Sequence, residues 1–268
     1  MPNKCPKCHH RHIFYNRCAH GGEYTDDSPH VTVGGCTCSH PHTPNDGELD
    51  TSFWDYSRTV AEQARLVSLV YIEQFIKALA TARENGRTIF IMGNGGSAAT
   101  ASHFAADLAK NTKQTTCKCG HGRNEHKFYY PEGIQLMACN VCDCGKYENV
   151  GKRPFRVICL ADNMSSITAY SNDIAYHSVF VEQLENLLQA GDVVIGVSGS
   201  GKSPNVLRAI EWANASEATT VGLTGFTGGP LFDMAQIKLH VPCSTYEIIE
   251  DVHMMILHSV VKEFKDNG

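Results

Sequence analysis

With 268 residues, of which 42% are hydrophobic, the chain is long enough for one sizeable core with appendages. A formal net charge of −5 does not favour bulk binding to nucleic acid, and no apolar run approaches the roughly 20 residues of a membrane span. The polar N-terminus, rich in Cys and His, does not resemble a signal peptide, so we expect a cytoplasmic protein.

Residues 1–50 form the first of two Cys/His clusters and have few large apolar side chains. In a chain without a signal peptide, interleaved cysteines and histidines favour metal sites over disulfides. Closely spaced thiolates from two turns can complete a tetrahedral zinc site. We therefore expect an N-terminal zinc-binding segment held by Cys5, Cys8, Cys36 and Cys38, with Cys18, His20, His40 and His42 as alternative ligands.

The second cluster spans residues 113–153 and interrupts the pattern of the main domain. Two close pairs of cysteines about twenty residues apart are typical of a zinc ribbon. The simplest set of ligands is Cys117, Cys119, Cys139 and Cys142, and His121, His126 or Cys144 could replace one of them.

The rest of 51–268 alternates short apolar runs with amphipathic segments. We expect strands at 88–92, 156–160, 192–197, 219–223 and 237–241, and helices at 51–86, 98–108, 166–169, 179–188, 205–215 and 247–264, with loops at 162–165 and 172–173. This alternation predicts an α/β domain with a mostly parallel sheet that is covered on both faces.

Two Gly-rich loops each follow an expected strand and precede an expected helix. The first is Gly93-Asn94-Gly95-Gly96-Ser97, and the second runs from Ser198 to Ser203 with three serines. Glycines expose backbone N–H groups, and a helix N-terminus favours anions, so both loops are candidates for binding phosphate. Neither has the spacing of a Walker loop.

Acidic and imidazole side chains share faces on two of the expected helices. His103 and Asp107 lie four residues apart, and Glu250 and His258 lie about two turns apart on the last helix. Because the last helix is otherwise apolar, these residues indicate a polar site in a buried wall.

Four motifs, GNGGSAATASHFAADL, TAYSND, SGSGKSPNV and EDVHMMILH, resemble the sugar isomerase (SIS) domain family, and within it the phosphoheptose isomerase branch. The resemblance covers about 52–112 and 154–265. It implies a flavodoxin-like αβα sandwich with a five-stranded parallel sheet, assembled as a homotetramer with active sites at subunit interfaces. The two Cys/His segments, expected to be small zinc-ribbon-like modules, are additions to this family pattern.

The resemblance also implies roles for individual residues. Asp107 and His258 match the catalytic carboxylate and histidine, and the metal of zinc-bearing members is held at the positions of His103, Asp107, Glu250 and His258. The positions implied to bind substrate are Asn94, Gly95, Ser97, Asp162, Asn172, Asp173, Ser198, Ser200, Ser203 and Glu250.

Two positions depart from the family pattern, because Asp107 replaces a common Glu and Glu250 replaces a common Gln. We interpret them as a paired rearrangement that leaves room for tighter metal binding or another substrate. The implied reaction is the aldose–ketose isomerisation of sedoheptulose 7-phosphate through an enediol(ate). Two alternatives stay open: an isomerase of another sugar phosphate, or a non-catalytic SIS protein that docks a partner through its zinc modules.

Overall fold

The computed structural model describes residues 31–33, 36–38, 48–113, 117–121, 126–129, 136–142 and 151–267. Contacts divide the chain into two units, Met1–Thr59 and Val60–Gly268. In the first unit, β1 (Val31–Val33) pairs antiparallel with β2 (Cys36–Cys38). Helix α1 (Glu48–Arg65) contains the boundary between the units, and the predicted domain bounds at residue 50 and at 113–153 stay predictions. Within these ranges, no helix combines the length and apolar character that a bilayer crossing requires.

A five-stranded parallel sheet forms the centre of the second unit, in the order β6-β3-β7-β8-β9. Its strands are β3 (Thr88–Gly93), β6 (Arg156–Cys159), β7 (Val193–Ser198), β8 (Thr219–Thr224) and β9 (Ile237–His240). Every residue of β3 and β7 is buried, as a sheet covered on both faces requires. The predicted α/β fold with a five-stranded parallel sheet is confirmed.

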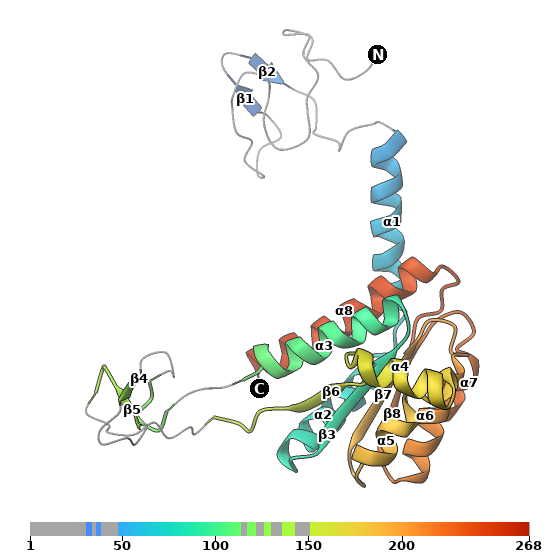
Figure 1. The fold of residues 1–268 in the computed structure, drawn as a ribbon. Coiled ribbons are helices and arrows are strands. Elements are labelled where there is room, and N and C mark those ends of the chain that lie inside the picture. Colours follow the sequence, from blue (N-terminus) through green and yellow to red (C-terminus); the bar gives the residue numbers. More distant parts are fainter. Residues whose placement is uncertain are drawn as a thin grey trace. The chain divides into compact units, whose positions relative to one another are not determined.

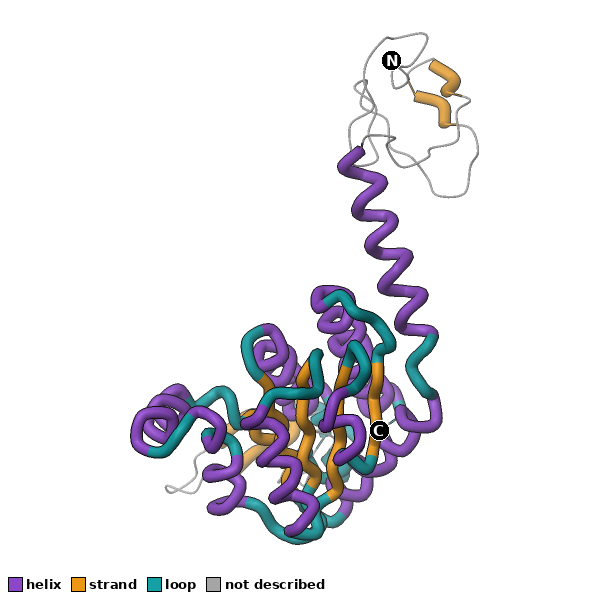
Figure 2. Tube along the Cα trace, turned by 90° about the vertical axis from the view of Figure 1, so that its right-hand side faces the viewer, coloured by secondary structure: helices purple, strands orange, loops and turns teal. Residues whose placement is uncertain are grey.

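Helices cover both faces of this sheet (Figures 1 and 2). Helices α2, α3 and α8 contact one another, and α5 and α7 both contact α6. Phe90, Met92 and Val194 pack in one buried cluster with residues of α5 and α6, so the alternate residues of β3 face the other layer. The helices are α2 (Leu69–Glu84), α3 (Gly96–Asn111), α4 (Met164–Asp173), α5 (Val181–Leu187), α6 (Pro204–Ala215), α7 (Gly229–Met234) and α8 (Tyr246–Asp266), with the short 3₁₀ helix η3 (Tyr176–Ser178).

The second Cys/His segment contains an antiparallel hairpin of β4 (His126–Tyr129) and β5 (Leu136–Cys139). The chain segments at the two ends of this insertion both contact the buried side chain of Arg83. The Arg83 guanidinium donates from Nε to the carbonyl of Arg153 and from Nη2 to the carbonyl of Thr112, the latter at 3.4 Å. Arg83 therefore anchors the chain on both sides of the insertion.

Two sequence predictions of helical extent were wrong. The helix expected over 51–86 is interrupted, because Ser68 takes an extended backbone (φ −67°, ψ 116°) and begins α2 as its N-cap, a position that serine favours. Residues 172–173 belong to the last turn of α4 rather than to a loop. Helix α7 lies between the strands expected at 219–223 and 237–241, where no helix was predicted.

Candidate functional site

The strand order creates a topological switch point between β3 and β7. The chain passes from β3 to β6 on one side and from β7 to β8 on the other. In open α/β sheets, ligands bind in the crevice at the carboxyl ends of such strands. Both predicted loops lie there: the first follows Gly93 at the end of β3, and the second begins at Ser198, the last residue of β7.

The second loop is a compact turn lined by hydroxyl groups. Ser198 Oγ and Ser203 Oγ lie 3.0 Å apart, and the Ser200 hydroxyl accepts from the N–H of Lys202 at 3.3 Å. The N–H of Gly201 donates to the carbonyl of Ser198 at 2.9 Å and closes the turn. Ser203 is the N-cap of α6, yet its hydroxyl makes no capping bond and instead lies beside that of Ser198. Hydroxyls gathered before a helix N-terminus suit a phosphate.

The first loop already faces a carboxylate. An ideal Cβ at Gly96 would lie 2.4 Å from Oε2 and 2.6 Å from Oε1 of Glu250, so glycine at this position permits the approach. Gly95, with φ of 55°, turns the chain into α3, and Ser97 is buried in the first turn. Because like charges repel, the Glu250 carboxylate disfavours a phosphate at this helix N-terminus. The serine loop has no acidic residue, and its role in binding phosphate stays a prediction.

His103, Asp107 and His258 converge where α3 packs against α8. Asp107 Oδ2 lies 3.3 Å from His103 Nε2 and 3.9 Å from His258 Nε2, and the two Nε2 atoms are 3.5 Å apart. The rings meet edge to face with centroids 5.0 Å apart. Asn111 Nδ2 donates to Asp107 Oδ1 at 2.9 Å, which directs Oδ2 toward the imidazoles.

This group has the donor set and spacing of a metal site. A tetrahedral zinc with ligands at about 2.0–2.1 Å places neighbouring ligand atoms roughly 3.3 Å apart, close to the distances among these three side chains. Three protein ligands leave the fourth position open, as in catalytic zinc sites. The His103 and His258 side chains are 50% and 48% exposed, so a small molecule can reach them.

The structure does not bring Glu250, the fourth predicted ligand, into this group. Glu250 lies eight residues before His258, which is about 12 Å along α8. The changes at Asp107 and Glu250 therefore do not compensate each other by direct contact. Glu250 belongs with the first loop, and its predicted contact with substrate stays compatible with that place.

The remaining predicted sugar contacts are exposed. Asp162, Asn172 and Asp173 have exposed side chains, and Asn172 Nδ2 donates to Asp173 Oδ1 at 2.8 Å. Asn163, beside Asp162, caps α4 by accepting from the N–H of Ser166 at 3.1 Å. The roles of Asp162, Asn172 and Asp173 in binding the sugar stay predictions.

A second potential metal site lies in the insertion and consists of Cys119, His121, Cys139 and Cys142. These are three of the four residues in the simplest predicted set, with His121 in place of Cys117. Cys139 Sγ lies 3.5 Å from His121 Nδ1 and accepts from the N–H of Val141 at 3.4 Å. Partial burial raises the pKa of the Cys139 thiol, but hydrogen bonds from the Val141 and Cys142 backbone and from the thiols of Cys142 and Cys119 lower it to about 7. A thiolate, the form that binds metal, is thereby favoured.

The other predicted cysteine ligands are not in this group. Cys117 is buried, and its N–H donates to the carbonyl of His121 at 2.9 Å. In the N-terminal segment, Cys36 and Cys38 are the first and last residues of β2. Cys5 and Cys8 lie outside the described residues, as do the alternatives Cys18, His20, His40, His42 and Cys144.

Two residues at the switch point were not predicted from the sequence. Asn205, in the first turn of α6, exchanges two hydrogen bonds with Asn94, and the Tyr176 hydroxyl from η3 donates to Asn94 Oδ1 at 2.8 Å. A polar residue directly after Ser203-Pro204 was a signal for Asn205. The sequence around Tyr176 carried none.

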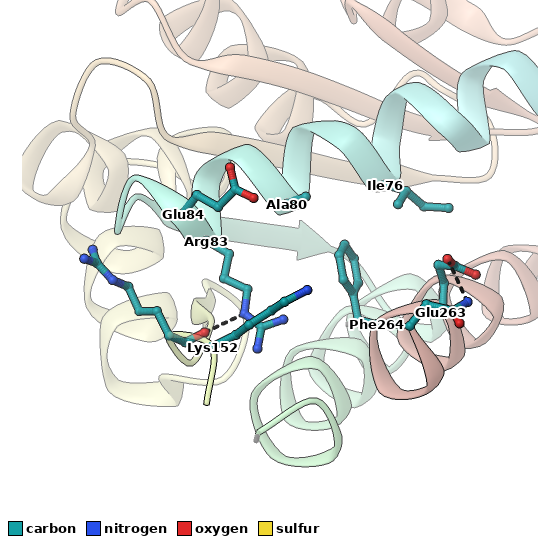
Figure 3. A pocket seen from close by; sticks show the side chains of 9 residues that line it. Ile76, Ala80, Arg83, Glu84, Lys152, Glu263 and Phe264 are labelled. Atoms are coloured by element: carbon teal, nitrogen blue, oxygen red, sulfur yellow. Dashed lines mark hydrogen bonds between the residues drawn. The ribbon is translucent and has the colours of Figure 1, made fainter. Parts of the chain in front are cut away.

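A cavity of about 460 Å³ lies elsewhere, at the root of the insertion (Figure 3). The side chains of Ile76, Lys152 and Phe264 line it, together with Arg83. None of the predicted site residues lines this cavity, which involves the C-terminal turns of α2 and α8. The cavity is therefore separate from the switch point.

Comparisons with known proteins identify the family. Residues 146–225 match the model of the SIS domain. Phosphoheptose isomerase of Nitratiruptor sp. is 34% identical over 177 residues, which is 66% of this chain and 75% of that protein. Phosphoheptose isomerase of Aliarcobacter butzleri is 32% identical over 189 residues, 70% of this chain and 81% of that protein.

The fold comparison agrees. The structure of a phosphoheptose isomerase from Francisella tularensis superposes with a TM-score of 0.63 at 24% identity, covering 83% of this chain and all of that one. At this identity the likeness concerns the fold, while the curated relatives establish the family. The chain belongs to the phosphoheptose isomerase family of SIS-domain proteins.

Proposed function

We propose that this chain is an aldose–ketose isomerase that interconverts sedoheptulose 7-phosphate and D-glycero-D-manno-heptose 7-phosphate. The convergence of His103, Asp107 and His258 is the observation that carries the proposal, because a module that only binds sugar phosphates does not need this group. The names of the relatives supply the substrate.

The serine loop would hold the phosphate. Ser198, Ser200 and Ser203 offer hydroxyls within one turn before α6, and no acidic residue forms part of that turn. The first loop would face the sugar, since Glu250 already occupies the start of α3. Binding energy from the phosphate then positions the distant reacting carbons.

Asp107 and His258 would move the protons. In the ketose-to-aldose direction, the Asp107 carboxylate takes a proton from C1 while His258 gives one to the C2 carbonyl oxygen, forming the enediol. Asp107 then delivers its proton to C2, and His258 takes the proton of the C1 hydroxyl as the aldehyde forms. Both side chains finish in their starting protonation states.

His103, Asp107 and His258 fit a divalent ion by donor type and spacing, and zinc is the ion we propose. A bound ion supplies electrostatic stabilisation of the charge that develops on the sugar oxygens. Asp107 and His258 would move protons in the metal-free group, whereas both would be ligands in the loaded one. Whether turnover requires metal distinguishes a role in proton transfer from a role in binding the ion.

Distances along α8 support a site shared between subunits. Tyr246 packs against Gly199 of the serine loop, and His258 lies twelve residues later, about 18 Å along the helix. This separation supports the predicted homotetramer, in which a neighbouring chain completes each active site. We also propose structural zinc in the insertion and in the N-terminal segment, while the cytoplasmic location stays a prediction.

The experiment follows sedoheptulose 7-phosphate by NMR with metal-free and with metal-replete protein. We expect the aldose signals of the heptose 7-phosphate to appear, and Asp107→Ala and His258→Ala to lower the rate by at least about 100-fold. Lys110→Ala and Ser259→Ala, on the same helices, should retain the rate. No turnover by the wild type, or full activity of both site variants, contradicts the proposal.

A further inference from the structure

Asn205 joins the two loops of the switch point through a pair of side-chain amides. Asn205 is only 1% exposed. Asn94 Nδ2 donates to Asn205 Oδ1 at 2.9 Å, and Asn205 Nδ2 donates to Asn94 Oδ1 at 2.9 Å. The pair therefore links the loop after β3 to the helix that follows the serine loop.

The backbone determines the polarity of this pair. The N–H of Val206 donates to the Asn205 side chain at 3.0 Å, so the atom that it meets must be the oxygen. The atom of Asn94 that faces this oxygen must then be Nδ2. The remaining atom of Asn94 is its oxygen, which accepts from Asn205 Nδ2 and from the hydroxyl of Tyr176 at 2.8 Å.

This polarity decides what Asn94 can offer a ligand. Both lone pairs of its Oδ1 are used, and Nδ2 keeps one N–H that has no partner among the described residues. A lone N–H is a donor for a sugar or phosphate oxygen, whereas a reversed amide would present an oxygen, which can accept from a sugar hydroxyl but repels a phosphate oxygen. Without Asn205, the amide of Asn94 could adopt either orientation.

We propose that Asn205 is a positioning residue of the sugar-phosphate site, which acts by fixing Asn94 as a hydrogen-bond donor to the ligand. Tyr176 supports the same orientation from η3. The proposal rests on the proposed function only in taking a sugar phosphate as the ligand. Asn205 itself, almost fully buried, acts through Asn94.

A double-mutant cycle on binding tests this. The dissociation constant of sedoheptulose 7-phosphate is measured by calorimetry for the wild type, Asn94→Ala, Asn205→Ala and the double variant. A hydrogen bond to a charged group is worth about 10- to 100-fold in affinity, so each single variant should bind weaker by that factor. Because Asn205 acts through Asn94, the double variant should bind within about threefold of Asn94→Ala.

Two more variants separate positioning from packing. Asn205→Asp keeps the size and both accepting contacts but turns an oxygen toward Asn94 Oδ1, so binding should stay weakened. Tyr176→Phe removes one exposed donor and should weaken binding by about threefold, and it keeps the test valid if Asn205→Ala does not fold. Asn214→Ala is the matched control: Asn214 also makes two side-chain hydrogen bonds from α6, to Met234 and Thr220, and its loss should leave affinity unchanged.

The outcomes separate this proposal from the proposed function. Wild-type affinity in Asn205→Asp, or additive losses in the cycle, overturns the positioning role even if the protein turns over its substrate. Coupled losses in a protein that binds the sugar but does not isomerise it support the positioning role and overturn the isomerase. Absence of binding by the wild type overturns both.

Discussion

Gly201 tests whether the serine loop is the phosphate site. It has a φ of 65°, is buried, and an ideal Cβ there would lie 1.8 Å from the carbonyl oxygen of Gly228. The N–H of Leu231 donates to the carbonyl of Gly201 at 3.1 Å, so the serine loop and the loop before α7 are in direct backbone contact. Gly201→Ala must separate these two segments.

The size of the effect follows from two costs. A positive φ costs an alanine about 1 kcal/mol, and forcing a methyl into a closed backbone contact costs about 1–3 kcal/mol more. Relief of the clash needs a displacement of more than about 1 Å, because carbon atoms pack at roughly 3.5 Å or more. We expect the free energy of unfolding to fall by about 2–4 kcal/mol, and the affinity for sedoheptulose 7-phosphate to fall at least about tenfold, because the hydroxyls no longer converge.

Gly191→Ala is the matched control. Gly191 has a φ of 85° at the opposite end of β7, and its ideal Cβ meets Nε of Arg87, a flexible side chain, at 3.3 Å. This variant should lose about 1 kcal/mol of unfolding free energy and retain its affinity. Urea unfolding and calorimetric titration measure both quantities. If Gly201→Ala binds the sugar phosphate as tightly as Gly191→Ala does, the serine loop is not the phosphate site.

Three further predictions concern charge and metal. Burial lowers the pKa of His253 to about 4, so between pH 6.5 and 4 the unfolded state binds a proton that the folded state does not. The free energy of unfolding should therefore fall by about 2 kcal/mol from pH 7 to pH 5. In urea unfolding, His253→Gln should remove that loss. Asp107→Asn should lose the metal of its own site but keep the metal of the cysteine–histidine group, as elemental analysis of the folded protein can show. Arg83→Met leaves the carbonyls of Thr112 and Arg153 without the guanidinium donor. The variant should lower the free energy of unfolding by about 2–4 kcal/mol and speed proteolysis in the insertion. Unchanged stability would contradict the anchoring role of Arg83.

Local patterns were sufficient to predict the sheet. The central strands β3 and β7 are short, mainly apolar runs that are buried on both faces, which makes them easy to recognise, whereas the edge strands β6 and β9 are only partly buried. The pairing of His103 with Asp107 also followed from helical spacing alone. Their meeting with His258, which is 151 residues after Asp107 in the chain, came from the family resemblance and not from any local pattern.

The features that the sequence did not reveal depend on contacts between distant segments. A polar residue at the start of an expected helix made Asn205 a candidate, but its burial against Asn94, 111 residues earlier in the chain, could not be read from the sequence. Ser68 divides a segment whose apolar spacing continues on both sides. His121 takes the place of Cys117 in the cluster because three-dimensional position, not residue type, selects among surplus ligands.

The pairing of α3 with α8 places Asp107 beside two imidazoles. The two helices run parallel, since Gly96 meets Glu250 near their starts and His103 meets His258 seven and eight residues later. Glu250 is thus held about two turns away from Asp107 and cannot make up for the lost methylene. Asn111, one turn beyond Asp107 on the same helix, donates from its amide to Oδ1 of Asp107, while Oδ2 faces both imidazoles. The contacts of Asp107 thus come from α3 and α8, whereas the Glu250 carboxylate places a charge beside the first loop.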